Sequence, residues 1–232
     1  MKKLFYLIVV LLVSCNTQTA TKQADLSDKA MTADDQKSLS PDSIISILKV
    51  GNMHFYGHKL SPKNDSLRMH QTANGQYPKA AILACIDSRV PVENVFDQGI
   101  GDLFVARVAG NIVDPSILGS LEYSCFEAGA KVIMVLGHEH CGAVKAAVED
   151  VRAGNITALL ANIKPAIDST KTDGPRTDKN DAFLHDVAVE NVKLTIKKIR
   201  TDSPILNKME QEKKIMIIGG IYDIDSGKIT FF

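Results

Sequence analysis

Two short apolar runs in this chain each end at side chains that bind metal ions. The first run covers residues 80–84 and is followed by Cys85. The second covers residues 132–137 and is followed by His138 and Cys141. Apolar runs of this length are typical of buried parallel strands, and ligands in open α/β sheets bind at the carboxyl ends of such strands. The sequence therefore predicts an α/β fold with a functional site at one edge of its sheet.

The chain alternates between strand-like and helix-like segments from residue 42 to its end. This alternation predicts one α/β domain over residues 42–232, with a mainly parallel central sheet flanked by helices. A chain of 232 residues is long enough to bury the core of such a domain. Strands are expected at 80–84, 103–108, 132–136 and 214–220 with a closing pair over 221–232, and helices at 44–55, 91–96, 116–130, 142–152, 156–167 and 183–201.

Composition argues against two other classes of protein. The formal net charge is zero, and the sequence has no basic stripe interleaved with aromatic residues, so nucleic-acid binding is not expected. The four cysteines are too few and too widely spaced for a disulfide framework.

Residues 1–14 have the pattern of a bacterial export signal. Two lysines precede an apolar stretch, residues 4–13, that is too short to span a bilayer. The segment ends in Leu12-Val13-Ser14-Cys15, which resembles the lipoprotein box whose cysteine is diacylated. The polar residues 15–41 predict a flexible tether. We therefore expect an exported domain, anchored by lipid to a bacterial membrane on its periplasmic or cell-surface side; an ordinary secretory signal would export the domain without the anchor.

Two thiolates and one imidazole form a good zinc-binding set. Catalytic zinc sites use three protein ligands and keep a fourth position for water, whereas structural sites are closed by a fourth protein ligand. The spacing of His138 and Cys141 lets both face one metal ion at a strand-to-helix turn. We therefore predict that Cys85, His138 and Cys141 hold zinc, which lowers the pKa of a bound water to about 7.

The two metal-binding segments also resemble a known family. Cys85-x-Asp87-Ser88-Arg89 followed by Gly137-His138-x-x-Cys141-Gly142 is similar to the motifs of the β-class carbonic anhydrases. The resemblance covers about residues 43–232, and the ordered joint occurrence of its short motifs is specific. The other matching segments are Leu48-Lys49-x-Gly51-Asn52-x-x-Phe55, Gly75-Gln76-x-Pro78, Gly101-Asp102-Leu103-Phe104-Val105, Arg107-Val108-Ala109-Gly110-Asn111 and Gly220-x-Tyr222-Asp223.

The resemblance implies a catalytic pair, Asp87 and Arg89. In the family the arginine holds the aspartate away from the metal, and the carboxylate accepts a hydrogen bond from the zinc-bound hydroxide. That bond orients the hydroxide toward carbon dioxide. In part of the family the matching aspartate instead closes the zinc in an inactive state, and this alternative applies to Asp87 as well.

The resemblance also implies a substrate site completed by a second subunit. Gln76 matches a glutamine that reaches across a dimer interface to bicarbonate, so a homodimer or homotetramer is expected. Phe104 and Tyr123 match residues that line the narrow substrate cleft. Gly142 lets the chain approach the site closely and offers a backbone N–H there.

One family feature is missing from this sequence. Some members bind inhibitory bicarbonate at a second site built on a tryptophan three residues before the first zinc cysteine. Here that position is Ile82, and the chain contains no tryptophan. Arg107 matches the arginine of that second site but cannot build it alone. We therefore expect the open form of the enzyme, which does not switch.

The predicted function is the zinc-dependent, reversible hydration of carbon dioxide to bicarbonate and a proton. One alternative is a hydrolase of carbon disulfide or carbonyl sulfide on the same fold. A second alternative is a non-catalytic surface lipoprotein that binds zinc. The presence of both Asp87 and Arg89 favours the enzyme over this second alternative.

Overall fold

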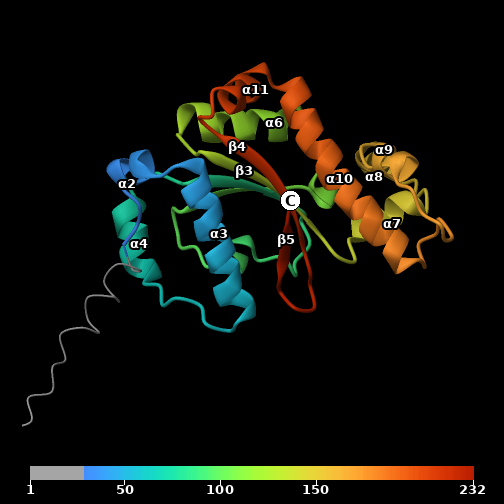
Figure 1. Cartoon of the computed structure of the whole chain (residues 1–232), viewed down its shortest axis with the longest axis horizontal. Coiled ribbons are helices and arrows are strands. Elements are labelled where there is room, and N and C mark those ends of the chain that lie inside the picture. Colours follow the sequence, from blue (N-terminus) through green and yellow to red (C-terminus); the bar gives the residue numbers. More distant parts are fainter. Residues whose placement is uncertain (1–28) are drawn as a thin grey trace, which may run out of the picture.

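The computed structural model describes residues 29–232 (Figure 1). The expected export signal at residues 1–14, the expected lipid site Cys15 and the first part of the expected tether, residues 15–28, lie outside the described residues. Between residues 29 and 232, no helix combines the length and the apolar character needed to cross a membrane.

Five strands form one sheet in the order β2-β1-β3-β4-β5. Neighbouring strands run parallel, except that β5 pairs antiparallel to β4. The prediction of a mainly parallel sheet is therefore confirmed, but the first strand of the expected closing pair is the end of β4 and not a separate strand. The strands are β1 (Ala80–Ala84), β2 (Leu103–Arg107), β3 (Val132–His138), β4 (Met216–Tyr222) and β5 (Ile229–Phe231).

The sheet is covered by helices on both faces, because successive residues of each strand point to opposite sides. Leu83 and Ile133 face one hydrophobic core, while Ile82 and Met134 face the other. Every residue of β1 and β3 is buried. The first core is closed by α6 (Pro115–Glu122), α7 (Gly142–Val148), α8 (Gly154–Leu160), α9 (Lys164–Ser169), α10 (Asp181–Asp202) and α11 (Pro204–Gln211), and the second by α3 (Pro41–Tyr56) and α5 (Val92–Val95).

The helices differ from the sequence prediction in several places. The helix expected at 116–130 is α6 followed by a π-helical turn, η2 (Tyr123–Glu127), in which the N–H of Ala128 donates to the carbonyl of Tyr123. The helix expected at 156–167 is broken into α8 and α9, and Pro165 stands in the first turn of α9. Two short helices were not expected, α4 (Asp65–Thr72) and α11.

The expected tether at 15–41 is wrong for its last part, because the folded structure begins before residue 42. Helix α2 (Ala33–Ser38) starts at a capping box formed by Thr32. Gln36 donates from Nε2 to the carbonyls of Pro78 and Ala128 at 2.8 and 2.9 Å, which fixes α2 to the domain. The attachment is made by hydrogen bonds to distant backbone groups and not by a run of apolar residues, so composition gave no sign of it.

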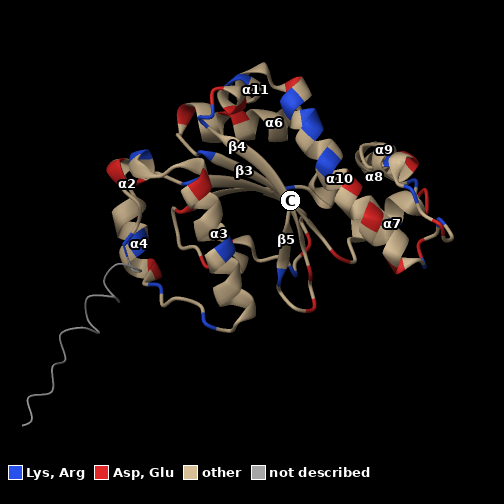
Figure 2. Cartoon of the chain, in the orientation of Figure 1, with Lys and Arg blue, Asp and Glu red and all other residues tan. Residues whose placement is uncertain are grey.

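Most charged residues lie on the helices and loops around the sheet (Figure 2), but three of them are buried together. Asp102 pairs with Arg68 at 3.1 Å and with Lys79 at 3.1 Å. The side chains of all three are only 6–7% exposed. Lys79 immediately precedes β1 and Asp102 immediately precedes β2, so this buried charge network lies at the amino ends of the strands.

A second cluster of charged and polar side chains surrounds Asp97, whose backbone has a left-handed φ of 52°. The Asp97 carboxylate accepts hydrogen bonds from the Ser61 hydroxyl at 2.7 Å and from Lys63, and it contacts His54 Nδ1 at 2.8 Å. Burial alone would raise the pKa of Asp97, but these hydrogen bonds outweigh burial and hold the pKa below its ordinary value. The cluster ties the loop after α3 to the end of α5.

Candidate metal centre

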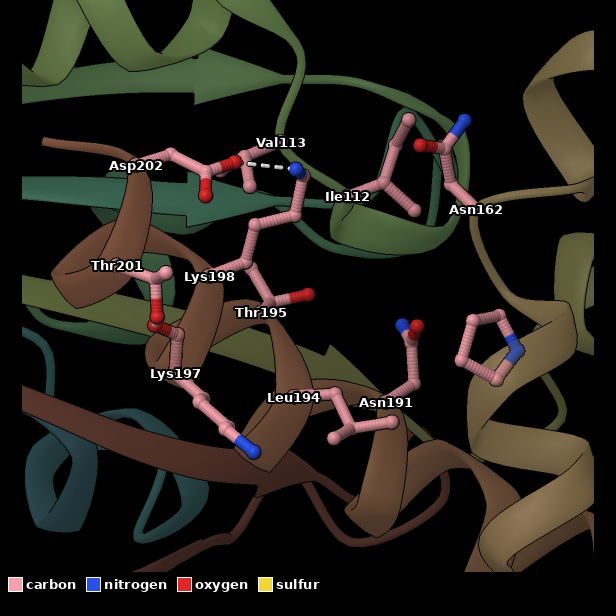
Figure 3. Close-up of a pocket in the computed structure, with 11 residues that line it drawn as sticks. Ile112, Val113, Asn162, Asn191, Leu194, Thr195, Lys197, Lys198, Thr201 and Asp202 are labelled. Atoms are coloured by element: carbon pink, nitrogen blue, oxygen red, sulfur yellow. Dashed lines mark hydrogen bonds and ion pairs between the residues drawn. The ribbon is translucent and has the colours of Figure 1, made fainter.

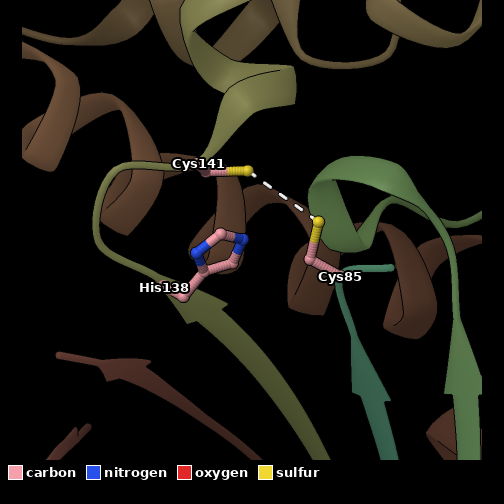
Figure 4. A group of neighbouring side chains, drawn as sticks. All are labelled: Cys85, His138 and Cys141. Carbon is pink, nitrogen blue, oxygen red and sulfur yellow. Dashed lines mark hydrogen bonds between the residues drawn. The ribbon is translucent and has the colours of Figure 1, made fainter. Parts of the chain in front are cut away.

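Cys85 lies directly after β1, where the chain leaves the sheet (Figure 4). It is 4% exposed, and its Sγ accepts a hydrogen bond from the N–H of Gly110 at 3.3 Å. Gly110 has a φ of 71°, and a Cβ at this position would lie 2.6 Å from the side chain of Ile163. A glycine is therefore required for the backbone to reach the Cys85 sulfur.

His138 is the last residue of β3 and is 1% exposed. Its Nδ1 lies 2.8 Å from the carbonyl oxygen of Glu139, to which it donates a hydrogen. The lone pair of the neutral ring is then on Nε2. Nε2 is buried and has no hydrogen-bond partner anywhere in residues 29–232. A buried nitrogen of this kind is costly unless it binds a ligand, and a metal ion satisfies it.

Cys141 caps the start of α7, and its Sγ lies 4.0 Å from that of Cys85. The ligand atoms of Cys85, His138 and Cys141 all lie within 4.8 Å of one another. A tetrahedral zinc ion with Zn–S bonds of about 2.3 Å separates two sulfurs by a little under 4 Å. The three side chains therefore fit zinc in both donor type and spacing, and the predicted grouping of these residues is confirmed.

Without a metal ion between them, the Cys85 and Cys141 sulfurs share one proton. The hydrogen bond from Cys141 is the largest effect on Cys85 and lowers its pKa to about 4, while the same contact raises the pKa of Cys141. At neutral pH this pair is therefore one thiolate and one thiol. A metal ion that binds both sulfurs releases the remaining proton, so metal affinity rises with pH.

Asp87 and Arg89 form the expected pair beside the three ligands. The Asp87 carboxylate accepts from Arg89 Nε and Nη2 at 2.9 and 2.8 Å and from the Arg89 backbone N–H at 2.9 Å. The Arg89 hydrogen bonds lower the pKa of Asp87 to about 2, so the group is a carboxylate at neutral pH. Asp87 Oδ2 lies 4.0 Å from His138 Nε2, which places the carboxylate next to the metal-ligand group.

Three residues that contact the motif segments had no predicted role there. Arg107, at the end of β2, donates to the carbonyls of Cys85 and Asp87. His185 on α10 contacts the Glu139 carboxylate at 2.6 Å, and the Glu139 carbonyl holds the His138 ring. Sequence reasoning assigned Arg107 to a different site and gave Glu139 and His185 none, because spacing along the chain does not show that α10 lies beside the second motif.

Three of the remaining predicted site residues, Gln76, Phe104 and Tyr123, line hollows that no metal ligand lines. Phe104 and Tyr123 pack edge to face, with ring centroids 6.4 Å apart, and line a surface hollow of about 510 Å³. Gln76 lines a separate hollow of about 300 Å³ next to Gly101. Neither hollow is lined by a metal ligand. Gly142 is exposed at the start of α7, directly after Cys141.

A further hollow of about 280 Å³ lies between α10, the start of α9 and the segment that follows the turn η1 (Ala109–Asn111) (Figure 3). Its lining includes Ile112, Asn191 and Leu194, together with the Lys198–Asp202 ion pair. None of the three metal ligands lines this hollow. It is therefore separate from the metal centre.

Comparisons with known proteins agree with this geometry. The sequence model of the family described as carbonic anhydrase matches residues 80–229. Carbonic anhydrase 2 of Mycobacterium tuberculosis is 33% identical over 187 residues, which cover 78% of this chain and 87% of the relative.

Solved structures show the same similarity at the level of the fold. A β-carbonic anhydrase from Coccomyxa superposes with a TM-score of 0.64 at 26% identity, over 72% of this chain and 78% of that one. A β-carbonic anhydrase from Sordaria macrospora, described as tetrameric, superposes with a TM-score of 0.60 at 24% identity, over 82% of this chain and 96% of that one.

Proposed function

This chain belongs to the β-class carbonic anhydrases, and on that premise we propose how its own residues carry out the reversible hydration of carbon dioxide to bicarbonate and a proton. The observation that carries the proposal is the buried group of Cys85, His138 and Cys141, in which His138 Nε2 has no other partner in the described structure. These three side chains would hold a zinc ion, which would supply a bound water that ionises near neutral pH.

The Asp87 carboxylate orients the reacting water. Its Oδ2 lies 4.0 Å from His138 Nε2, where it would accept a hydrogen bond from the reacting water and so orient that water toward carbon dioxide. Arg89 keeps the carboxylate ionised and directs both of its oxygens through three hydrogen bonds. Arg89 Nη2 also reaches the carbonyl of His140 at 3.3 Å, so one side chain connects the two motif segments. Asp87 is therefore a catalytic residue, and Arg89 positions it.

Substrate binding requires a second copy of the chain. Gln76, Phe104 and Tyr123 line hollows that no metal ligand of their own chain lines. A partner subunit brings its Gln76 amide to the bicarbonate oxygen, and the Phe104 and Tyr123 rings form an apolar wall for carbon dioxide. Gly142 offers its backbone N–H beside Cys141. The assembly is a homodimer or homotetramer, supported by the tetrameric relative with this fold.

The test of this function is stopped-flow hydration of carbon dioxide by the zinc-loaded protein. Activity should disappear with a zinc chelator and return with added zinc. Cys141→Ser should lose most of its zinc and its activity, since one of three ligands is gone. Turnover of carbonyl sulfide or carbon disulfide without carbon dioxide hydration would indicate the alternative hydrolase. Bound zinc with no turnover of any of these substrates would indicate a non-catalytic zinc protein.

The place of action is a further part of the proposal. The segment Leu12-Val13-Ser14-Cys15 supports export and a lipid on Cys15, so that the enzyme works at a bacterial membrane on its periplasmic or cell-surface side. Detergent-phase partitioning of the mature protein, and a lipid-modified N-terminal cysteine in mass spectrometry, are the expected results. An intact Met1 on the mature protein would contradict the anchor.

A further inference from the structure

Arg107 contacts the backbone of the segment that carries Cys85 and Asp87. Its Nε donates to the Cys85 carbonyl at 2.8 Å, and its Nη2 donates to the Asp87 carbonyl at 2.5 Å. Arg107 is the last residue of β2, in register with Ala84, the last residue of β1. Its side chain therefore starts at the point where the two strands stop pairing.

Cys85 and Asp87 lie where the sheet no longer holds the backbone. The last main-chain bond between the two segments joins the N–H of Val108 to the carbonyl of Ala84 at 3.1 Å. Beyond it, no main-chain N–H of β2 reaches the carbonyls of Cys85 and Asp87, although the Asp87 carbonyl also accepts from the N–H of Val90 at 3.1 Å within its own turn. The planar guanidinium of Arg107 supplies two hydrogen bonds in place of the missing strand pairing. The backbone therefore remains hydrogen-bonded for three residues beyond the end of β1.

Holding these two carbonyls in place also orients the side chains of the same two residues, Cys85 and Asp87. The direction of a side chain follows from the backbone angles of its residue, so a held backbone at Cys85 sets its Sγ and a held backbone at Asp87 sets its carboxylate. Arg107 forms no ion pair within residues 29–232, so its charge is directed to these carbonyls alone. Arg89 acts on the same segment in a different way, since it binds the Asp87 carboxylate and not the carbonyl.

We propose that Arg107 is a positioning residue for the metal centre. By binding the backbone carbonyls of Cys85 and Asp87, Arg107 keeps the Cys85 sulfur and the Asp87 carboxylate in fixed positions relative to each other. The inference rests on the proposed metal centre but goes beyond it, because Arg107 touches no ligand atom. It also gives Arg107 a role that needs no bound anion, consistent with Ile82 being fully buried in the core where the second bicarbonate site would require a tryptophan.

The test compares Arg107→Gln with a matched control, Arg176→Gln. Arg176 is also exposed and also donates to two backbone carbonyls, those of Thr170 and Ile167, but it lies in the loop between α9 and α10 and its partners are outside the metal-ligand segments. Both substitutions remove a guanidinium and two hydrogen bonds to backbone carbonyls; Arg176→Gln also removes a contact with the Phe183 ring. Zinc affinity is measured by chelator competition, and ligand geometry by the visible absorption of the cobalt-substituted protein.

Arg107→Gln should weaken zinc binding by roughly 10–100-fold, the usual effect of losing a partner that orients a metal ligand. Its cobalt spectrum should change, and kcat should fall with little change in KM. Arg107→Lys, which reaches one carbonyl at a time, should lie between the parent and Arg107→Gln. Arg176→Gln should keep the parent's zinc affinity and spectrum.

The proposal is overturned if Arg107→Gln keeps the parent's zinc affinity and cobalt spectrum and loses only as much thermal stability as Arg176→Gln. If Arg107→Gln does not fold, Arg107→Lys decides by the same two measurements. Because zinc affinity and the cobalt spectrum do not depend on turnover, they test Arg107 even if the protein fails to hydrate carbon dioxide. Failure of the proposed function and failure of this inference are therefore distinguishable.

Discussion

The buried charge network at the amino ends of the strands allows a quantitative prediction. Asp102→Asn keeps the size of the side chain but removes the one negative charge between Arg68 and Lys79. All three side chains are 6–7% exposed, so water does not replace the lost partner. Breaking a buried ion pair by removing one member costs about 3–5 kcal/mol, a large part of the 5–15 kcal/mol by which a typical domain is stable.

Burial also acts on the charge that remains. Burial lowers the pKa of Lys79, and the Asp102 carboxylate opposes that effect. In the variant the carboxylate no longer opposes it, so the folded state either keeps the Lys79 cation without its carboxylate partner or releases a proton from Lys79. The Gly99 N–H, which donates to Asp102 Oδ2 at 2.8 Å, can still find an acceptor in the asparagine oxygen. The loss should therefore be mainly electrostatic.

The assay is urea unfolding of the zinc-loaded protein, followed by circular dichroism at fixed protein and zinc concentration. With a slope near 3 kcal/mol/M, the midpoint should fall by on the order of 1 M. The control is Asp168→Asn, which removes the exposed Lys164–Asp168 pair on α9 and should leave the midpoint unchanged. Zinc content should stay at one per chain. A midpoint for Asp102→Asn within error of the control would refute the reasoning.

Three further predictions concern chemistry, acid stability and the anchor. Asp87→Asn keeps the side-chain volume but places an amide N–H where Arg89 and the reacting water need an acceptor. Zinc should stay bound while turnover in stopped-flow hydration falls by about 100-fold or more. Turnover equal to that of the parent would remove Asp87 from the mechanism. The pKa of Asp97 is lower in the folded than in the unfolded state, so its carboxylate stabilises the fold above the unfolded pKa of about 3.9, and this stabilisation is lost as pH falls through the folded pKa. Asp97→Asn should therefore reduce the fall of the urea midpoint with acidification, measured between about pH 2 and pH 7. An unchanged dependence of the midpoint on acid pH would count against the cluster around Asp97. Cys15→Ala should move the protein from the detergent phase to the aqueous phase with hydration unchanged, and continued partitioning into detergent would contradict a lipid anchor.

The sheet and the metal ligands could be predicted because their signals are local. β1 and β3 are buried on both faces, so they read as continuous apolar runs, and each is followed directly by its ligand residues. The first long helix was also expected, but it begins at Pro41, with Ser40 as its N-cap, and not at residue 44. Element ends of this kind depend on one or two hydrogen bonds.

What sequence reasoning missed depends on contacts between distant segments. Helix α2 is polar and is held by Gln36 to carbonyls 42 and 92 residues away, which no local pattern reveals. The π-helical turn at Tyr123 keeps helical spacing closely enough that periodicity predicts an unbroken helix. Arg107 was matched to an anion site, because its position was known from sequence but its hydrogen-bond partners were not.

The Cys85 and Cys141 sulfurs are only 4.0 Å apart, and this short distance makes zinc loading depend on the oxidation state of the pair. A disulfide needs its sulfurs about 2 Å apart, so a small local movement is enough for an oxidant to take two electrons from the pair and join them. The joined sulfurs are no longer two thiolates, and zinc cannot then be loaded until a reductant restores them. Zinc loading and oxidation therefore compete for the same two atoms. Under the proposed export to an oxidising compartment, the outcome depends on whether folding and zinc uptake are faster than the reaction with the oxidant.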